Sequence, residues 1–375
     1  MLSLYVHIPF CRERCHYCDF FLVARQEYVG RFFDALAEET RSKASLLEGR
    51  RIKAIHFGGG TPSIVPVSLI SGWLSQVSGL ARLEPDAEIT LEANPEDLTP
   101  GAIRDLRDAG VNRLSIGVQS FTDRKLRALG RAHSAKDALR TVALAQERFD
   151  SVAIDLMCGA EGEDIEEWAG DLHAALELRP PHISVYMLTL EEKTRLWRDV
   201  QRGLVELPDE AAQAAMYERA RRMLGGAGYR HYEVSNYALE GHHSRYNLSS
   251  WMREPYLGFG PSAHSFMIAG DEETRFSNAC SLTRYLADPA HSEEFREVLN
   301  PRQRFDEQVF LSLRIIRGLS LDFLRTGHES RAKHLDEALE RFLEQGWIRI
   351  DDGLVTLTGE GFLFADLVAT GLIHS

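Results

Sequence analysis

The sequence predicts an α/β fold in which a parallel sheet, with helices on its outside, closes into a barrel or partial barrel. A small C-terminal α+β domain is expected to follow it. Through the first half of the chain, short segments rich in Ile, Val and Leu alternate with segments of helical period. Six such βα units in a row are typical of a parallel sheet with right-handed crossovers. From about residue 300 this rhythm gives way to helices and one hairpin.

The predicted strands are short and bounded by Gly, Pro or Asp, and the predicted helices lie between them. The strands are 2–8, 52–57, 87–92, 111–118, 151–157 and 182–188. The helices between them include 27–47, 66–78, 100–109, 135–148 and 164–178. The first domain is therefore expected to span residues 1–230.

The chain changes character after residue 230. Residues 231–267 are rich in His, Tyr, Asn, Ser and Gly and predict a long ordered loop, so we assign 231–299 to a functional loop and connecting region. Residues 300–375 predict a winged-helix-like domain. Its elements are a helix at 331–345, a hairpin with an Asp-Gly turn in WIRIDDGLVTLT, and a final helix at 359–369.

Composition restricts the partners. The chain of 375 residues is 44% hydrophobic and 26% charged, as in an ordinary globular protein. Its net charge of −13 disfavours nucleic acid and anionic lipid. No stretch approaches about 18 consecutive apolar residues, so no integral membrane segment is expected. The N-terminal MLSLYVHIPFC lacks the features of a signal peptide, so we expect a cytoplasmic location.

Three of the five cysteines, Cys11, Cys15 and Cys18, follow the first predicted strand with the spacing C-x3-C-x2-C. The odd count and the missing export signal argue against a disulfide framework. Three thiolates can bind three irons of a [4Fe–4S] cluster and leave the fourth iron open, whereas an electron-transfer cluster normally takes four cysteines. Structural zinc, which needs four ligands, is the alternative. The fourth zinc ligand would be His16, Cys158 or Cys280.

This spacing at the end of the first strand, with Tyr17 before the last cysteine, resembles the radical S-adenosylmethionine (SAM) superfamily. The resemblance implies that SAM chelates the open iron through its amino and carboxylate groups. It also implies that an electron from the cluster, supplied by a donor, cleaves SAM to a 5′-deoxyadenosyl radical.

Further motifs follow the other predicted strands, at the edge where barrels collect their chemistry. The glycines of HFGGGTP permit close backbone approach to a ligand, and Arg131 offers a fork for a carboxylate. Glu92 and Asp155 offer carboxylates for hydroxyl or amino groups, and Tyr5 is placed to face the same pocket. Each has a structural alternative. The glycines could simply form a tight turn, Arg131 could be a solvated arginine at a helix end, and Tyr5 could be a core aromatic. Glu92 could be a helix-capping or surface acid, and Asp155 a buried acid at a strand end.

Five motifs resemble one branch of this superfamily, oxygen-independent coproporphyrinogen III dehydrogenase (HemN) and the HemW haem chaperones, over almost the whole chain. They are YVHIPFC, HFGGGTPS, LSIGVQSF, YEVSNYA and YLGFGPSAHS. The resemblance places Tyr17 beside the adenine of SAM. The other SAM-pocket positions that it implies are Tyr5, Gly59, Gly60, Thr61, Glu92, Gln119, Arg131 and Asp155.

Within this branch, three features favour the HemW type. Phe20 stands where the dehydrogenases have a further cysteine, the first strand begins near residue 2 without their N-terminal extension, and the chain is shorter than theirs. The implied role is to bind haem and deliver it to acceptor proteins. The alternative is an enzyme that uses radical chemistry on coproporphyrinogen III or another tetrapyrrole.

One departure concerns haem. HemW proteins usually show His-Asn-x-x-Tyr-Trp, where this sequence has Tyr246 and Asn247, then Ser250 and Trp251. At this segment Tyr246 replaces the histidine that would be an axial ligand of haem. Tyr246 is an alternative, because tyrosinate binds ferric haem. The other candidates are His242, His243 and His264, each of which is alternatively a surface or loop residue.

Overall fold

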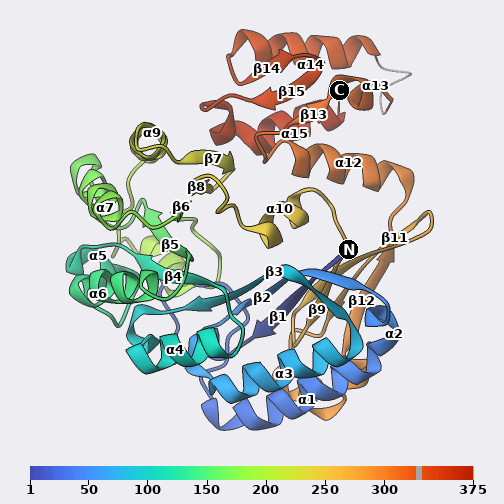
Figure 1. Ribbon diagram of the computed structural model, residues 1–375. Helices are drawn as coiled ribbons and strands as arrows, with labels where there is room; N and C mark the ends of the chain where they lie inside the picture. The colour runs from blue at the N-terminus through green and yellow to red at the C-terminus, as the bar shows by residue number, and fades with distance from the viewer. Residues whose placement is uncertain (327–331, 375) are drawn as a thin grey trace.

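The computed structural model describes residues 1–326 and 332–374, and its six predicted βα units are present (Figure 1). Their strands are β1 (Leu2–Ile8), β2 (Arg51–Gly59), β3 (Arg82–Ala93), β4 (Arg113–Gln119), β5 (Ser151–Cys158) and β6 (His182–Met187). They pair in parallel in this order and form the centre of a 12-stranded sheet. The predicted fold class, a partial barrel, is confirmed.

Helices cover the outer face of these strands (Figure 1). They are α1 (Val29–Ser42), α2 (Ala44–Leu47), α3 (Val67–Leu80), α4 (Pro100–Asp108), α5 (Asp123–Leu129), α6 (Ala135–Gln146) and α7 (Ile165–Leu178). Two further helices, α8 (Arg195–Gln201) and α9 (Glu210–Gly226), follow β6. On β1, Leu4 and Val6 are fully buried in the main hydrophobic core. Because side chains alternate along a strand, Tyr5 and His7 face the opposite, inner side.

The segment expected to be a loop contributes strands to both ends of the sheet. These strands are β7 (Arg230–Glu233), β8 (Asn236–Ala238), β9 (Tyr256–Phe259), β10 (His264–Ala269), β11 (Glu272–Asn278) and β12 (Glu293–Val298). The helices α10 (Arg245–Trp251) and α11 (Leu282–Ala287) lie among them. β8 runs antiparallel to β6, and β9 runs parallel to β1, so the first strand has a neighbour on each side. These strands are short and carry many polar residues, which hid the alternation that predicts a strand.

The C-terminal domain has its own buried core and a 3-stranded sheet. Its elements are α12 (Pro301–Ser312), β13 (Leu319–Ser320), α13 (Leu321–Thr326), α14 (Ala332–Glu344), β14 (Ile348–Asp351), β15 (Leu354–Leu357) and α15 (Ala365–His374). Asp352 and Gly353 have φ of 50° and 75°, which confirms the predicted Asp-Gly hairpin turn. Residue 331 of the predicted helix 331–345, and residue 375, lie outside the described residues. The domain bounds 1–230, 231–299 and 300–375 stay a prediction.

No helix in residues 1–326 or 332–374 has the length and apolar character that crossing a bilayer requires.

Candidate functional site

The three cysteines lie on the loop between β1 and α1, and all are partly buried free thiols. Backbone hydrogen bonds hold this loop: Cys11 N donates to Val23 O at 3.2 Å and Cys18 N to Cys15 O at 3.2 Å. Two predicted SAM positions contact the sulfurs, since Thr61 Oγ1 lies 3.0 Å from Cys11 Sγ and Arg131 Nη1 lies 3.4 Å from Cys15 Sγ. The structure therefore brings the cysteine loop together with Thr61, which follows β2, and Arg131, which follows α5.

Burial raises the pKa of the Cys11 thiol to about 11, although the hydrogen bond with Thr61 opposes the shift. Among the described residues, no group of three or more His, Cys, Asp or Glu side chains is arranged around a single metal ion. A [4Fe–4S] cluster makes a different demand, because each cysteine binds its own iron and the three sulfurs need not converge on one point.

The glycine-rich loop at the end of β2 packs against the protein itself. A Cβ added to Gly60 would lie 2.6 Å from Phe10 O, and one added to Gly59 would lie 2.6 Å from the ring of His7. Gly60 N donates to Ile8 O at 2.8 Å, and Gly59 has a φ of 106°. These two glycines thus let the end of β2 approach the start of the cysteine loop, in addition to any approach to a ligand.

Arg131, expected to fork a carboxylate of SAM, is held by protein groups. Its Nη2 donates to Asn94 Oδ1 at 2.6 Å and to Gly117 O at 2.8 Å. Tyr17, beside it, is partly buried, and this burial raises the pKa of its phenol well above the usual range. The guanidinium therefore fixes the strand ends around Cys15, and its Nε is the part without a protein partner.

Glu92 and Asp155 lie on the inner side of the barrel. Glu92 Oε1 lies 2.8 Å from His56 Nε2, and the Glu92 side chain is still 40% exposed. Asp155 is enclosed beside Ser115 and Ser184; burial raises the pKa of its carboxyl to about 6, and the hydrogen bond from Ser184 opposes the shift. An accessible carboxylate and a partly buried carboxyl of raised pKa thus lie on the same inner side of the barrel.

Several buried polar atoms at this site have no partner among the described residues. They are Gln119 Oε1, Thr90 Oγ1, Arg131 Nε and His56 Nδ1. Gln119 also has a backbone φ of 64°, which is uncommon for a residue other than glycine. Since buried polar groups are normally hydrogen-bonded, this edge of the sheet fits a polar ligand such as SAM.

The inner face also holds an aromatic stack that the sequence analysis did not predict. Tyr246 of α10 lies over His56 with ring centroids 4.9 Å apart, and Tyr5 lies 6.1 Å from His56 and 6.0 Å from Tyr246. Glu88 holds α10 there: it accepts from Arg245 N at 3.1 Å and from Tyr246 N at 3.2 Å. His56 was missed, although it pairs with Tyr5 across β1 and β2 and so shares its inward period.

The other haem candidates do not gather around Tyr246. Trp251 lies against the C-terminal domain, with Arg314 6.0 Å from its ring. His243 packs on the ring of Tyr232 at 4.4 Å. The backbone carbonyl of His242 accepts a hydrogen bond from Arg113, and the backbone N–H of Asn247 donates to the Ser244 hydroxyl. His264 is exposed at the start of β10.

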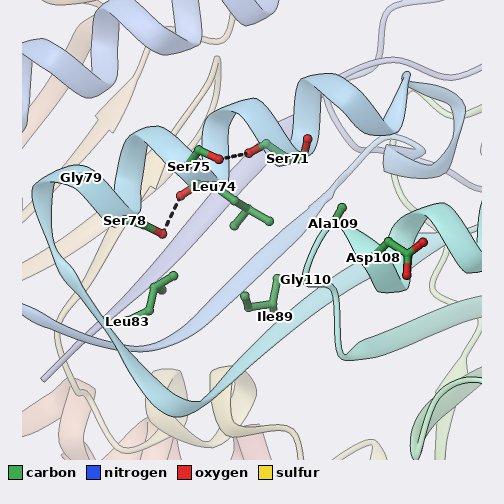
Figure 2. Close-up of a pocket in the computed structure, with 10 residues that line it drawn as sticks. All are labelled: Ser71, Leu74, Ser75, Ser78, Gly79, Leu83, Ile89, Asp108, Ala109 and Gly110. Carbon is green, nitrogen blue, oxygen red and sulfur yellow. Dashed lines mark hydrogen bonds between the residues drawn. The ribbon is translucent and has the colours of Figure 1, made fainter.

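A pocket of about 590 Å³ lies apart from this site, on the outer side between α3 and α4 (Figure 2). Its lining includes Leu74, Leu83 and Ile89, and Ser75 and Ser78 donate their hydroxyls back to carbonyls of α3. It contains none of the predicted site residues.

Comparisons with known proteins agree with this architecture. The model of the radical SAM superfamily matches residues 5–175, and that of the HemN C-terminal domain matches residues 299–364. The structure of coproporphyrinogen III oxidase (HemN) from Escherichia coli superposes with a TM-score of 0.85 at 24% identity, over 99% of this chain and 89% of that one. Fold and cysteine loop thus define a radical SAM protein, a class that carries a [4Fe–4S] cluster and binds SAM.

Two relatives named "Heme chaperone HemW" align over nearly their full lengths. The protein from Lactococcus lactis is 34% identical over 96% of this chain and 94% of its own. The protein from Bacillus subtilis is 33% identical over 98% of each chain. The chain belongs to the HemW family.

Proposed function

We propose that this chain binds haem and delivers it to haem-accepting proteins. The observation that carries the proposal is the nearly full-length similarity to two proteins named "Heme chaperone HemW". Phe20 stands where the dehydrogenases have a further cysteine, and this difference supports the HemW type over the dehydrogenases. Its side chain is 67% exposed.

In this proposal Cys11, Cys15 and Cys18 hold the [4Fe–4S] cluster, and the neighbouring strand ends hold SAM. When bound, this pair supplies radical chemistry and requires an electron donor as partner. Arg131 and Thr61 are adjacent to the sulfurs, and the exposed carboxylate of Glu92 is available to the polar groups of SAM. The unpartnered Gln119 Oε1 is a further acceptor.

The structure gives less support to Tyr246 as the axial ligand of haem. Burial raises the pKa of its phenol well above the usual range, and the ring is stacked on His56. A phenol whose pKa is raised in this way stays neutral and is a poor source of tyrosinate. We therefore propose that Tyr246 forms part of the inner wall of the SAM site.

The test is anaerobic reconstitution of the full chain followed by titration with haem, with and without SAM. We expect uptake of one haem per chain and its transfer to an added apo-haem protein. The contrasting outcome is that the protein takes up no haem but releases 5′-deoxyadenosine and converts coproporphyrinogen III; this result would replace the chaperone by the enzyme.

A further inference from the structure

A second pocket lies beside the cysteine loop, at the edge of the barrel core, and has a volume of about 530 Å³. This is within the usual range of roughly 300–1,000 Å³ for small-molecule and cofactor sites. We call it the Cys280 groove. One wall is the segment that follows the cysteine loop, with Phe21, Val23, Arg25, Tyr28 and Arg31, and the other is Cys280 with the start of α11, including Leu282 and Leu286.

Part of the lining of the groove is apolar, alongside the polar Arg25, Arg31, Ser281 and Thr283. Phe21, Val23, Tyr28 and Leu286 are partly buried and pack on the main core, which keeps these side chains in place. A flat hydrophobic ring system entering between them would bury apolar surface on both of its faces.

The groove also carries two positive charges. Arg31 lies over the ring of Tyr28 at 5.8 Å, and no ion pair of Arg25 or Arg31 occurs within residues 1–326 and 332–374. Glu27, between them in the sequence, is exposed and does not line the groove. In a chain with a net charge of −13, two unpaired guanidinium groups beside an apolar slot are suited to carboxylates.

Cys280 presents an exposed free thiol at the same groove. The turn that carries it is held by backbone hydrogen bonds, from Ala279 N to Ser292 O at 2.8 Å and from Ser281 N to Ala279 O at 2.8 Å. A cysteine thiolate is a known axial ligand of haem iron.

From these features we infer that the Cys280 groove is the binding site of the haem cargo. The macrocycle lies between Phe21 and Leu286, the two propionates pair with Arg25 and Arg31, and Cys280 Sγ, after losing its proton to solvent, binds the ferric iron. This inference rests on the proposed function. Haem is the occupant to which we commit, because it combines a flat apolar ring, two carboxylates and a metal with an open axial position.

The groove shares backbone contacts with the cysteine loop. Val23 O accepts from Cys11 N at 3.2 Å, Val23 N donates to Pro9 O at 2.7 Å, and the Phe21 carbonyl lies 3.0 Å from His7 Nε2. A ligand that moves this wall is therefore expected to shift the cysteine loop, and a change at the cysteine loop is expected to shift this wall of the groove.

The test compares variants of the full reconstituted protein by haem titration. Ligation is followed by the ferrous carbon monoxide complex, whose main absorption band an axial thiolate shifts strongly to the red, in difference spectra that remove the contribution of the cluster. We expect Cys280→Ser to lose this thiolate signature. The double variant Arg25→Gln/Arg31→Gln should bind haem about 3- to 10-fold more weakly.

The matched control is Arg140→Gln/Arg148→Gln, which removes two exposed arginines in and next to α6 and should leave haem affinity unchanged. Tyr246→Phe should keep the thiolate signature. Failure of the wild-type chain to bind haem would reject the proposed function itself. If wild-type uptake is intact and Cys280→Ser keeps both signature and affinity, only the groove is rejected. An effect of Cys280→Ser without any effect of the paired arginine variant would indicate adventitious attachment to a surface thiol and would also overturn the groove.

Discussion

At the scale of single residues, the cysteine loop combines burial with contacts that leave the sulfurs available. Cys11 and Cys15 each have one polar neighbour from another segment, Thr61 and Arg131. A thiol must lose its proton to bind iron, so the free energy of cluster binding has to overcome the raised pKa of Cys11. The loop has three cysteines, so no further cysteine of the loop can replace one that is lost.

We therefore expect Cys11→Ala, Cys15→Ala and Cys18→Ala each to abolish the brown cluster absorbance after anaerobic reconstitution. Iron and sulfide analysis of the same samples quantifies the loss. The control is Cys158→Ser, which removes a buried thiol at the end of β5 and should leave the iron content unchanged. Full iron and sulfide in any of the three alanine variants would contradict the ligand assignment.

Tyr246 contributes its ring more than its hydroxyl to the inner wall. Tyr246→Phe keeps the stack on His56 and should change the free energy of unfolding by less than about 1 kcal/mol. Tyr246→Ala removes the ring and should cost about 3–5 kcal/mol. Urea unfolding of the two variants checks this difference. Equal losses in both would show that the hydroxyl, not the ring, is the important part.

At the scale of elements, a short helix on the inner face depends on a strand for its position. α10 has 7 residues, fewer than an isolated helix needs, and the Glu88 carboxylate of β3 accepts from its first N–H groups. The negative charge also lies at the positive end of the helix dipole. Glu88 thus fixes the helix that carries Tyr246.

Glu88→Ala is expected to cost about 1–3 kcal/mol in the free energy of unfolding, because it leaves buried donors unpaired. It should also speed hydrogen exchange at the amides of Arg245 and Tyr246. Glu88→Gln, which keeps an acceptor oxygen, is the matched control and should lose less. Wild-type exchange at these amides in Glu88→Ala would mean that another contact holds α10.

The sequence was sufficient for the parts of the fold with a clear period. β1 to β6 are apolar runs between turn residues, and their ends predicted where Glu92 and Asp155 would lie. The strands β7 and β8 have only 4 and 3 residues, too few to show alternation. The partnership of His56 with Tyr246 depends on a contact between distant parts of the chain, which no local pattern reports. α9 was missed although Met216, Ala220 and Leu224 follow helical spacing.

At the scale of the whole molecule, the edge of the barrel and the C-terminal domain meet around a buried acid. Val234 N donates to Arg314 O at 2.9 Å, and Glu233 bridges to Ile315. Burial raises the pKa of the Glu233 carboxyl to about 7, and hydrogen bonds with Ser235, Asn236 and Trp251 oppose the shift. Its Oε1 has no partner among the described residues.

This acid makes the stability of the protein depend on pH. The native state binds the proton of Glu233 more tightly than the unfolded chain, so between about pH 4 and pH 7 its contribution to the free energy of unfolding falls as pH rises. The full change is about 3–4 kcal/mol at most. Glu233→Gln should remove this part of the slope, which urea unfolding at several pH values measures. Parallel wild-type and variant curves from pH 4 to 8 would contradict the assignment.

The pairing of β9 with β1 sets an order of events during synthesis. The strand that leads into the cysteine loop leaves the ribosome first, whereas one of its two neighbours, residues 256–259, emerges some 250 residues later. Until then one side of β1 presents unpaired backbone groups that invite association with other chains. If iron were delivered to the nascent protein, β1 would be paired on one side only. We therefore expect the cluster to be inserted after β9 has completed the sheet.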